Sequence, residues 1–167
     1  LLASGLHAPS IFAADSEAGF LLLEDLGQAL LQSLLAADRG QWLFDQVSPL
    51  LSVMAKKTAT DGLPRYSATR LQAELDLLPQ WFGQQHLGRC FSPSEQVNWQ
   101  LLCDQLIASA EAQPQVFVHR DFHSSNLHQL KNGSVGIIDF QDAVLGPLSY
   151  DLVSWLWDRY ISWPRSA

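Results

Sequence analysis

The sequence has little positive charge and no long apolar segment. Ten lysine and arginine residues stand against 17 aspartate and glutamate residues, which gives a net charge of −7. A nucleic acid or an anionic membrane would require basic patches, so the composition argues against both as partners. No apolar run approaches the roughly 20 residues that span a bilayer, so we expect no membrane contact.

Cysteine is also scarce. Cys90 and Cys103 are the two present, which do not make a disulfide framework, so we predict a reducing compartment and a cytoplasmic location. The N-terminus has no Met and no basic segment, and therefore no complete signal peptide. We expect both termini to be truncated, since the sequence begins within an apolar segment at Leu1–Ala3 and ends at Arg165–Ala167, directly after an aromatic-rich segment. We expect the chain to be part of a longer protein.

A glycine-rich nucleotide-binding loop is missing as well. What remains is a globular composition, 167 residues with 47% hydrophobic content, which is enough for one domain. Two short apolar runs, 11–14 and 20–23, predict a β-hairpin. Several helices, a pair of strands and a last helix follow. This order predicts an α+β fold rather than alternating βαβ units.

Helices are expected near 28–37 and over 42–59, 67–85, 92–112 and 148–163. Pro49 predicts a kink or a break in the second of these. Ser92 is the candidate cap of the fourth. Trp81 and Phe82 are expected in the core, where aromatic side chains dominate the packing. Residues 142–147 are expected to form an irregular loop.

Two acids and one amide lie at the ends of short apolar runs. Val116–Val118 runs into a His-Arg-Asp sequence that ends at Asp121, and Asn126 follows five residues later. A second apolar run, Val135–Ile138, ends in Asp139. This spacing matches a phosphoryl-transfer catalytic loop followed by a metal-binding Asp-Phe pair. Loop positions held by a rigid scaffold are where catalytic groups concentrate.

The chemistry of phosphoryl transfer needs these residue types. An acceptor hydroxyl needs a carboxylate to orient it and take its proton, which Asp121 can do. A triphosphate needs hard oxygen ligands for magnesium, which Asn126 and Asp139 can supply. The sequence therefore predicts that all three side chains converge on one point.

Two other interpretations of the same stretch stay open. The acids and the amide could serve only the turns of a polar hairpin. Alternatively, His119, His123 and His128 could bind a metal, although their spacing suits neither one helix face nor a zinc site with cysteine and histidine ligands.

The sequences of these motifs resemble those of a known enzyme family. VHRDFHSSNL (118–127) and IIDFQDAVLGPLSYDLVSW (137–155) resemble the aminoglycoside phosphotransferase family of kinase-like enzymes. Residues 138–154, WDRYISWP (157–164) and a helical stretch at 63–88 are most similar to its bacterial anomeric sugar kinases, which act on N-acetylmuramate and N-acetylglucosamine.

The resemblance implies a protein-kinase-like fold. Residues 1–26 would be the end of the N-lobe sheet with the hinge, and residues 27–167 a mostly helical C-lobe with a truncated C-terminus. Residue by residue, it implies a catalytic base (Asp121), magnesium ligands that also hold ATP (Asn126 and Asp139), hinge contacts to adenine (Glu24, Asp25 and Leu26) and structural supports of the catalytic loop (His119, Arg120 and Asp151).

The function implied is an ATP- and magnesium-dependent kinase that phosphorylates a sugar, at the anomeric hydroxyl of N-acetylmuramate or N-acetylglucosamine. An N-acetylmuramate carboxylate would want a cation, for which Arg65, Arg70 and Arg159 are candidates. An aminoglycoside or amino-alcohol phosphotransferase is the alternative enzyme. A truncated, non-catalytic interaction module is the alternative without activity, because the glycine-rich loop and phosphate-binding Lys have no counterpart here. Alone, the chain is expected to bind ATP poorly. The sequence does not indicate an oligomeric state.

Overall fold

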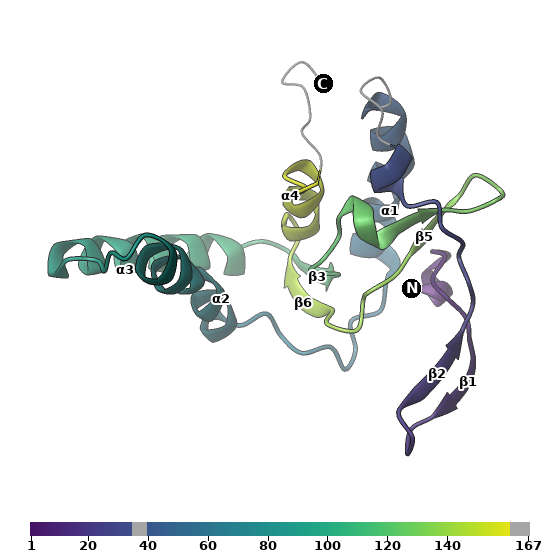
Figure 1. Ribbon diagram of the computed structural model, residues 1–167, viewed down its shortest axis with the longest axis horizontal. Coiled ribbons are helices and arrows are strands. Elements are labelled where there is room, and N and C mark those ends of the chain that lie inside the picture. The colour runs from purple at the N-terminus through teal and green to yellow at the C-terminus, as the bar shows by residue number, and fades with distance from the viewer. Residues whose placement is uncertain (35–39, 161–167) are drawn as a thin grey trace.

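Three small antiparallel sheets of two strands each organise the computed structural model, which describes residues 1–34 and 40–160 (Figure 1). The pairs are β1 (Ile11–Asp15) with β2 (Phe20–Leu23), β3 (Gln115–Val118) with β6 (Val144–Pro147), and β4 (Leu127–Gln129) with β5 (Val135–Ile137). Helices surround the last two sheets, so the predicted α+β class is confirmed. No helix in the described ranges is long and apolar enough to cross a membrane.

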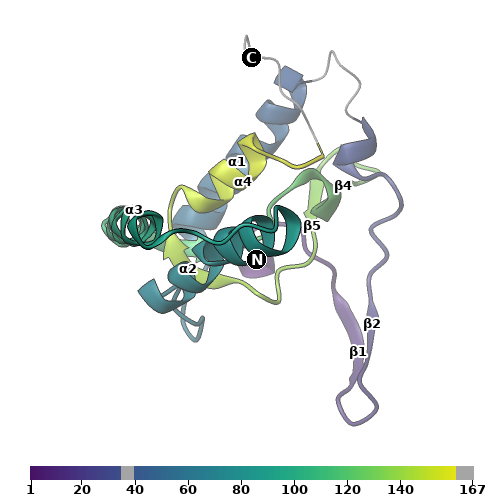
Figure 2. The ribbon, with the colours of Figure 1, turned by 60° about the vertical axis from the view of Figure 1, so that its left-hand side comes forward.

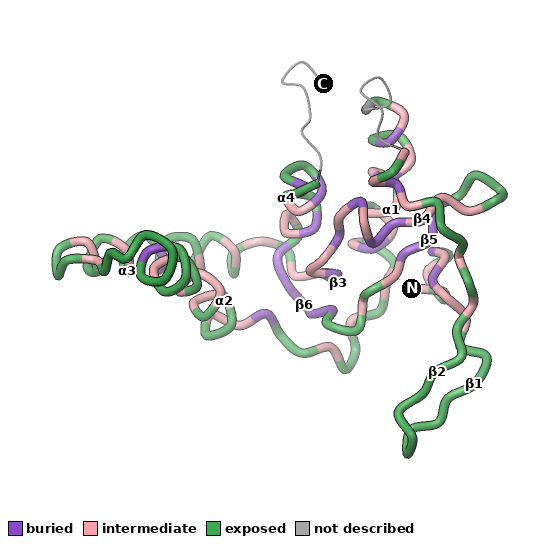
Figure 3. The backbone as a smooth tube through the Cα atoms, viewed as in Figure 1, coloured by how far each residue is buried: buried purple, intermediate pink, exposed green. Residues whose placement is uncertain are grey.

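The predicted hairpin is present and projects away from the rest of the molecule (Figure 2). The Asp15 carboxylate accepts the backbone N–H groups of Glu17 and Ala18 at the turn. Figure 3 shows the hairpin as exposed along its length, and the side chain of Phe20 is 71% accessible. The hairpin therefore adds little to the core. It is preceded by a short 3-10 helix, η1 (Leu2–Ser4), which ends at Gly5 in a left-handed conformation.

The central helix α1 (Gly40–Lys57) packs against β3 and buries Leu43, Val47 and Met54. It runs through Pro49 as one helix, so of the predicted kink or break there is no break. Proline removes one backbone hydrogen bond, and the buried apolar stripe on both sides of it keeps the helix together. The helix predicted near 28–37 is a 3-10 turn, η2 (Leu31–Leu34), in its described part. Residues 35–37 lie outside the described ranges.

An arm of paired helices extends from the opposite side of the molecule (Figure 1). It consists of α2 (Ala68–Leu75), a π-helix η3 (Leu78–His86) and α3 (Pro93–Glu111). The helix predicted over 67–85 is divided at Asp76 into α2 and the π-helix η3, while the backbone keeps right-handed helical angles at Asp76 and Leu77 and Pro79 lies near the start of η3. Trp81 and Phe82 are 64% and 55% exposed, which contradicts the expected core positions. The arm is thin and stands away from the body, so one face of it has no neighbouring element to cover it (Figure 3).

Ser92 begins α3 as predicted. Its hydroxyl accepts the backbone N–H of Glu95 at 3.4 Å, and the Glu95 carboxylate accepts the backbone N–H of Ser92 at 2.9 Å. This reciprocal pair is a capping box, which satisfies two backbone donors at the helix start.

The strand pairing differs from the prediction at residues 142–147. This segment is not a loop, because residues 144–147 form β6, which pairs with β3 in the register Val118 to Val144. The two strands that precede the acids are therefore not partners of each other, since β5 pairs with β4. The sequence does not predict this strand, because it contains Gly146 and Pro147 and both residue types are rare in strands. A larger residue at position 146 would be crowded, because a Cβ there would lie 3.2 Å from side-chain atoms of Tyr66 and Val118.

The hydrophobic core lies directly beneath the catalytic loop. Phe122 from that loop is fully buried, and its ring meets the ring of Trp155 from α4 (Tyr150–Leu156) with centroids 6.4 Å apart. The last helix ends at Leu156, earlier than the predicted 163, and residues 161–163 lie outside the described ranges. The core also includes apolar residues from the N-terminal segment, α1 and both central sheets (Leu6, Leu31, Leu43, Val47, Met54, Phe117, Leu127, Ile137 and Ala143).

Candidate active site

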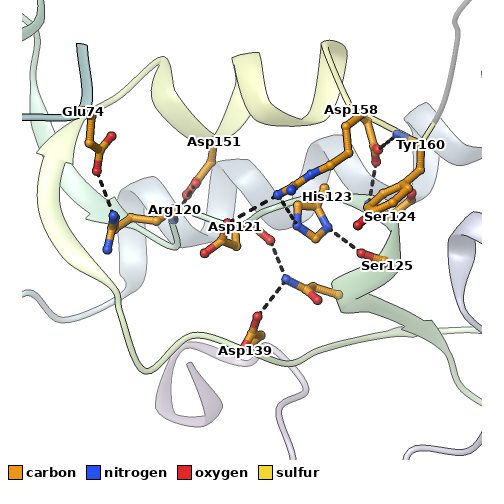
Figure 4. A network of polar contacts seen from close by, with 12 residues as sticks. Glu74, Arg120, Asp121, His123, Ser124, Ser125, Asp139, Asp151, Asp158 and Tyr160 are labelled. Atoms are coloured by element: carbon orange, nitrogen blue, oxygen red, sulfur yellow. Dashed lines mark hydrogen bonds and ion pairs between the residues drawn. The ribbon is translucent and has the colours of Figure 1, made fainter. Parts of the chain in front are cut away.

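The loop between β3 and β4 brings the predicted catalytic residues together (Figure 4). The side-chain amide nitrogen of Asn126, in the 3-10 turn η4 (Ser124–Asn126), donates to the backbone carbonyl of Asp121 at 2.9 Å. The same nitrogen donates to the carboxylate of Asp139 at 3.2 Å. Asn126 is 8% exposed, whereas the Asp121 side chain is 44% exposed. A buried amide thus joins the two acids, and the Asp121 carboxylate faces solvent.

Asp139 follows β5 in a left-handed conformation with φ 65°. The side-chain amide of Gln141 donates to its second carboxylate oxygen at 2.8 Å. Because the Asn126 nitrogen is occupied by the two bonds above, its side-chain oxygen is the atom left to act as a ligand. An amide oxygen and a carboxylate are the hard donors that magnesium prefers, so this pair fits that ion.

The histidines of the loop do not form the alternative metal site. The Nε2 of His119 donates to the carbonyl of Ile138 at 2.9 Å, and burial lowers the pKa of the His119 ring. A ring nitrogen of His123 lies 2.8 Å from the Ser125 hydroxyl. The three rings point to different partners, since His128 meets the carbonyl of Gly27 at 3.0 Å. Within the described ranges no group of three His, Cys, Asp or Glu side chains could hold a metal ion.

Asp151 of α4 holds the first turn of the loop. Its two carboxylate oxygens accept the backbone N–H groups of His119 at 2.7 Å and Arg120 at 3.1 Å. Arg120 is left-handed with φ 79°, a conformation that is uncommon for a residue other than glycine. Asp151 is 4% exposed, and this burial raises the pKa of its carboxyl to about 6, against the two backbone bonds that lower it.

The side chain of Arg120 points to the helical arm. Its guanidinium pairs with the carboxylate of Glu74 from α2 at 2.8 Å and lies 5.6 Å above the ring of Tyr66. The Tyr66 hydroxyl in turn bonds to Glu74 and lies 3.2 Å from the hydroxyl of Tyr150, and burial raises the pKa of Tyr66. Glu74 was not predicted from the sequence, because no local spacing connects it to Arg120, which is 46 positions away.

Asp158 is a second residue that the sequence analysis missed. It is 5% exposed, and its carboxylate accepts the backbone N–H of Ser124 at 2.6 Å and that of Tyr160 at 2.8 Å. The next residue, Arg159, reaches the loop with its side chain, so that a guanidinium nitrogen lies 3.9 Å from the Asp121 carboxylate. The motif at 157–164 is part of the family resemblance in the sequence, but the motif alone does not indicate what Asp158 does.

The predicted hinge lies at a separate cleft of about 550 Å³. The Glu24 carboxylate accepts the backbone N–H of Ser10 at 3.1 Å and lies 3.2 Å from a ring nitrogen of His7. The bonds from Ser10 are the main reason that the pKa of Glu24 is lowered. Asp25 accepts the N–H of Gly27 at 2.8 Å. Asp121 and Asp139 do not line this cleft. Its lining comes from the predicted hinge, the residues on either side of it and the β4–β5 turn (His7, Glu24, Asp25, Leu26, Gly27, Gln28, Ala29, Gln129, Leu130, Lys131 and Asn132).

The full length of the chain, residues 1–167, matches the phosphotransferase enzyme family. The chain belongs to this family. Curated relatives of this chain include three proteins named N-acetylmuramate/N-acetylglucosamine kinase. The one from Pseudomonas aeruginosa is 39% identical over 165 residues, covering 99% of this chain and 48% of the relative. The one from Pseudomonas putida is 40% identical (99% and 49%), and the one from Neisseria meningitidis is 37% identical (95% and 48%). The chain therefore spans about half the length of these relatives, and the family resemblance is confirmed.

Two solved structures share the fold of this chain. Choline kinase LicA from Streptococcus pneumoniae superposes with a TM-score of 0.66 at 16% identity, covering 95% of this chain and 52% of that protein. The ADP-bound aminoglycoside phosphotransferase APH(2'')-Ib gives a TM-score of 0.57 at 14% identity, covering 89% and 53%. At these identities the likeness establishes the architecture alone, and it confirms the predicted protein-kinase-like fold.

Proposed function

We propose that this chain carries the catalytic residues of an ATP- and magnesium-dependent small-molecule kinase. The acceptor in this proposal is the anomeric hydroxyl of N-acetylmuramate or N-acetylglucosamine. The observation that carries it is the Asn126 amide, which donates to the backbone carbonyl of Asp121 at 2.9 Å and to the carboxylate of Asp139 at 3.2 Å. A proton acceptor and a pair of magnesium-type ligands thereby lie side by side. The names of the curated relatives support the sugar.

Asp121 would act as the base. It orients the anomeric hydroxyl and takes its proton while the sugar oxygen bonds to the γ-phosphorus and the bond from that phosphorus to ADP breaks. An anomeric hydroxyl is more acidic than an ordinary alcohol, so one exposed carboxylate suffices. Asn126 and Asp139 would hold magnesium, which when bound neutralises charge on the phosphates. Arg120 and Asp151 keep the backbone before Asp121 in place.

The nucleotide contacts and the domain division are part of the same proposal. Glu24, Asp25 and Leu26 would meet adenine at the hinge, which divides an N-lobe segment (1–26) from the C-lobe (27–167). The cleft beside these three residues supports that role. Cys90 and Cys103 are both free thiols, which agrees with the cytoplasmic location that we propose.

An aminoglycoside or amino-alcohol acceptor is the competing enzyme function. The structural likeness to choline kinase and to an aminoglycoside phosphotransferase is compatible with this competing function. At 14–16% identity, however, the likeness shows only a common fold. The guanidinium of Arg159, 3.9 Å from Asp121, argues against a polycationic or quaternary ammonium acceptor, because like charges repel at the acceptor position.

The test is an assay of the protein at its natural length with magnesium, ATP and one acceptor at a time. N-acetylmuramate, N-acetylglucosamine, kanamycin and choline are compared, and phosphorus NMR follows the product. We expect a sugar 1-phosphate from at least one of the two sugars. Phosphorylation of kanamycin or choline alone would move the protein to the competing function. No transfer to any acceptor would favour the non-catalytic interaction module.

A further inference from the structure

We propose that Arg159, supported by His123, forms a carboxylate-binding site beside the catalytic base and thereby favours the acidic sugar N-acetylmuramate over N-acetylglucosamine. This inference rests on the proposed function. Its starting point is a cation at the acceptor side of the loop. A guanidinium nitrogen of Arg159 lies 3.9 Å from the Asp121 carboxylate and 3.4 Å from the outer ring nitrogen of His123.

The backbone around Arg159 is fixed to the catalytic loop. Asp158, on its N-terminal side, accepts the N–H of Ser124 at 2.6 Å and that of Tyr160 at 2.8 Å while being 5% exposed. The Tyr160 ring, labelled in Figure 4, lies edge-on to the ring of His123 with centroids 5.7 Å apart, and the Arg159 guanidinium carbon lies 5.6 Å from the Tyr160 ring centre. The charged group is therefore held near Asp121 by contacts on several sides.

The guanidinium nevertheless stays open to a ligand. The Arg159 side chain is 64% exposed, and its 3.9 Å contact with Asp121 is longer than a hydrogen bond. A guanidinium carries five N–H donors in a planar fork that matches a carboxylate with two parallel bonds. Most of these donors are therefore unused by the contacts described, and a carboxylate on the acceptor can take them.

The other candidate cations lie elsewhere. Arg65 sits beside β6, where its backbone forms a bridge with Leu145, and Arg70 lies in the first turn of α2. Arg120 is already paired with Glu74. Of the three arginines considered from the sequence, Arg159 is the one that forms an ion pair with Asp121.

The chemistry of the two sugars makes the site selective. N-acetylmuramate differs from N-acetylglucosamine by a lactyl ether that ends in a carboxylate, while both carry the same anomeric hydroxyl. Asp121 can accept the proton of that hydroxyl in both sugars. Arg159 has an anionic partner only in N-acetylmuramate. Arg159 would also attract the transferred phosphate, but that attraction is common to both acceptors and leaves their ratio unchanged.

The test compares kcat/KM for the two sugars in the natural-length protein and in Arg159→Gln. We expect the ratio of N-acetylmuramate to N-acetylglucosamine to fall about 10- to 100-fold, since a charge-assisted pair is lost for one sugar. Arg159→Lys, which keeps the charge without the fork, should restore part of the ratio. With the methyl ester of N-acetylmuramate, which has no carboxylate, Arg159→Gln should change kcat/KM by the same factor as it does with N-acetylglucosamine.

Arg65→Gln and Arg70→Gln are the matched controls, and neither should change the ratio. An unchanged ratio in Arg159→Gln, or an equal change in Arg65→Gln or Arg70→Gln, would overturn the assignment of Arg159 while leaving the sugar kinase intact. Wild-type activity on N-acetylglucosamine alone would overturn the carboxylate site as well. A wild type that phosphorylates neither sugar would refute the proposed function itself, which is a different result.

Discussion

The His119 ring donates a hydrogen bond from Nε2 to the backbone carbonyl of Ile138 at 2.9 Å. His119 follows β3, and Ile138 directly precedes Asp139, so a single buried ring connects the proposed catalytic loop to the turn that carries the proposed magnesium ligand Asp139. Burial lowers the pKa of this ring, which is therefore neutral at pH 7 and holds one proton for the bond. The first histidine of the motif thus positions the two halves of the site relative to each other.

Replacement of His119 by Phe keeps the ring volume and removes the donor. The Ile138 carbonyl then loses its buried partner, which costs about 1–3 kcal/mol of unfolding free energy. Urea unfolding followed by circular dichroism measures the change. His86→Phe, at an exposed position on η3, is the control and should stay within about 0.5 kcal/mol of the wild type. Equal stability of His119→Phe and wild type would show that the bond to Ile138 has no net effect.

Asp121→Asn should abolish proton transfer while keeping the shape of the site. Loss of a general base lowers turnover by about a hundred- to ten-thousand-fold, with little change in nucleotide affinity. Steady-state kinetics with the best sugar acceptor, together with calorimetry of magnesium-ATP, measures both quantities. Asp61→Asn, an exposed acid in a distant loop, should leave both unchanged. If turnover of the Asp121→Asn protein equals that of the wild type, Asp121 is not the base.

Asp139→Ala should affect nucleotide binding through the metal. Removing one of the two proposed magnesium ligands leaves Asn126 alone, so the gain in ATP affinity on adding magnesium should be lost. Calorimetric titration of ATP with and without magnesium measures that gain. Asp142→Ala removes a nearby exposed charge without removing a proposed ligand, and it should keep the magnesium effect. A magnesium effect that survives in Asp139→Ala would exclude this carboxylate as a ligand.

Asp151 should give the protein a stability that depends on pH. Its folded-state pKa is raised from an ordinary value of 3.8 to about 6, so the folded protein holds this proton more tightly than the unfolded chain does. The resulting stability is present in full below pH 3.8 and is lost as the pH rises through 6, by about 3 kcal/mol in total. Urea unfolding between pH 4 and 7 should show this decline in the wild type relative to Asp151→Asn. A difference that is flat across this range would mean that the backbone bonds from His119 and Arg120 offset the cost of burial.

Much of the site could be predicted because its residues are close in sequence. Asn126 comes five residues after Asp121, and the turn that links β4 to β5 is short. The sequence spacing alone therefore predicts that Asp121, Asn126 and Asp139 lie together, as the hydrogen bonds of the Asn126 amide show. The capping box at Ser92 is equally local. Such features depend on neighbouring residues and not on the packing of the whole chain.

The supports of the site could not be predicted in the same way. Glu74 meets Arg120 across 46 positions, and Asp158 meets Ser124 across 34, so each pair exists only once the fold has formed. The partner of β3 was missed for a similar reason, because β6 is four residues long and ends in Gly-Pro. Trp81 was misplaced because its burial depends on neighbouring elements, and the arm projects away from them.

The β3–β6 pairing restricts where this chain can change in length. The segment 138–143 joins β5 to β6, and β6 is fixed beside β3 with Val118 opposite Val144. An insertion there that displaced β6 by one position would turn its buried side chains to the other face. The turn at 131–133 is exposed and lies away from this pairing, but Lys131 and Asn132 line the cleft beside Glu24, Asp25 and Leu26. A change of length at 138–143 should therefore lower folding stability when it moves β6, whereas one at 131–133 should leave the β3–β6 register intact and alter that cleft.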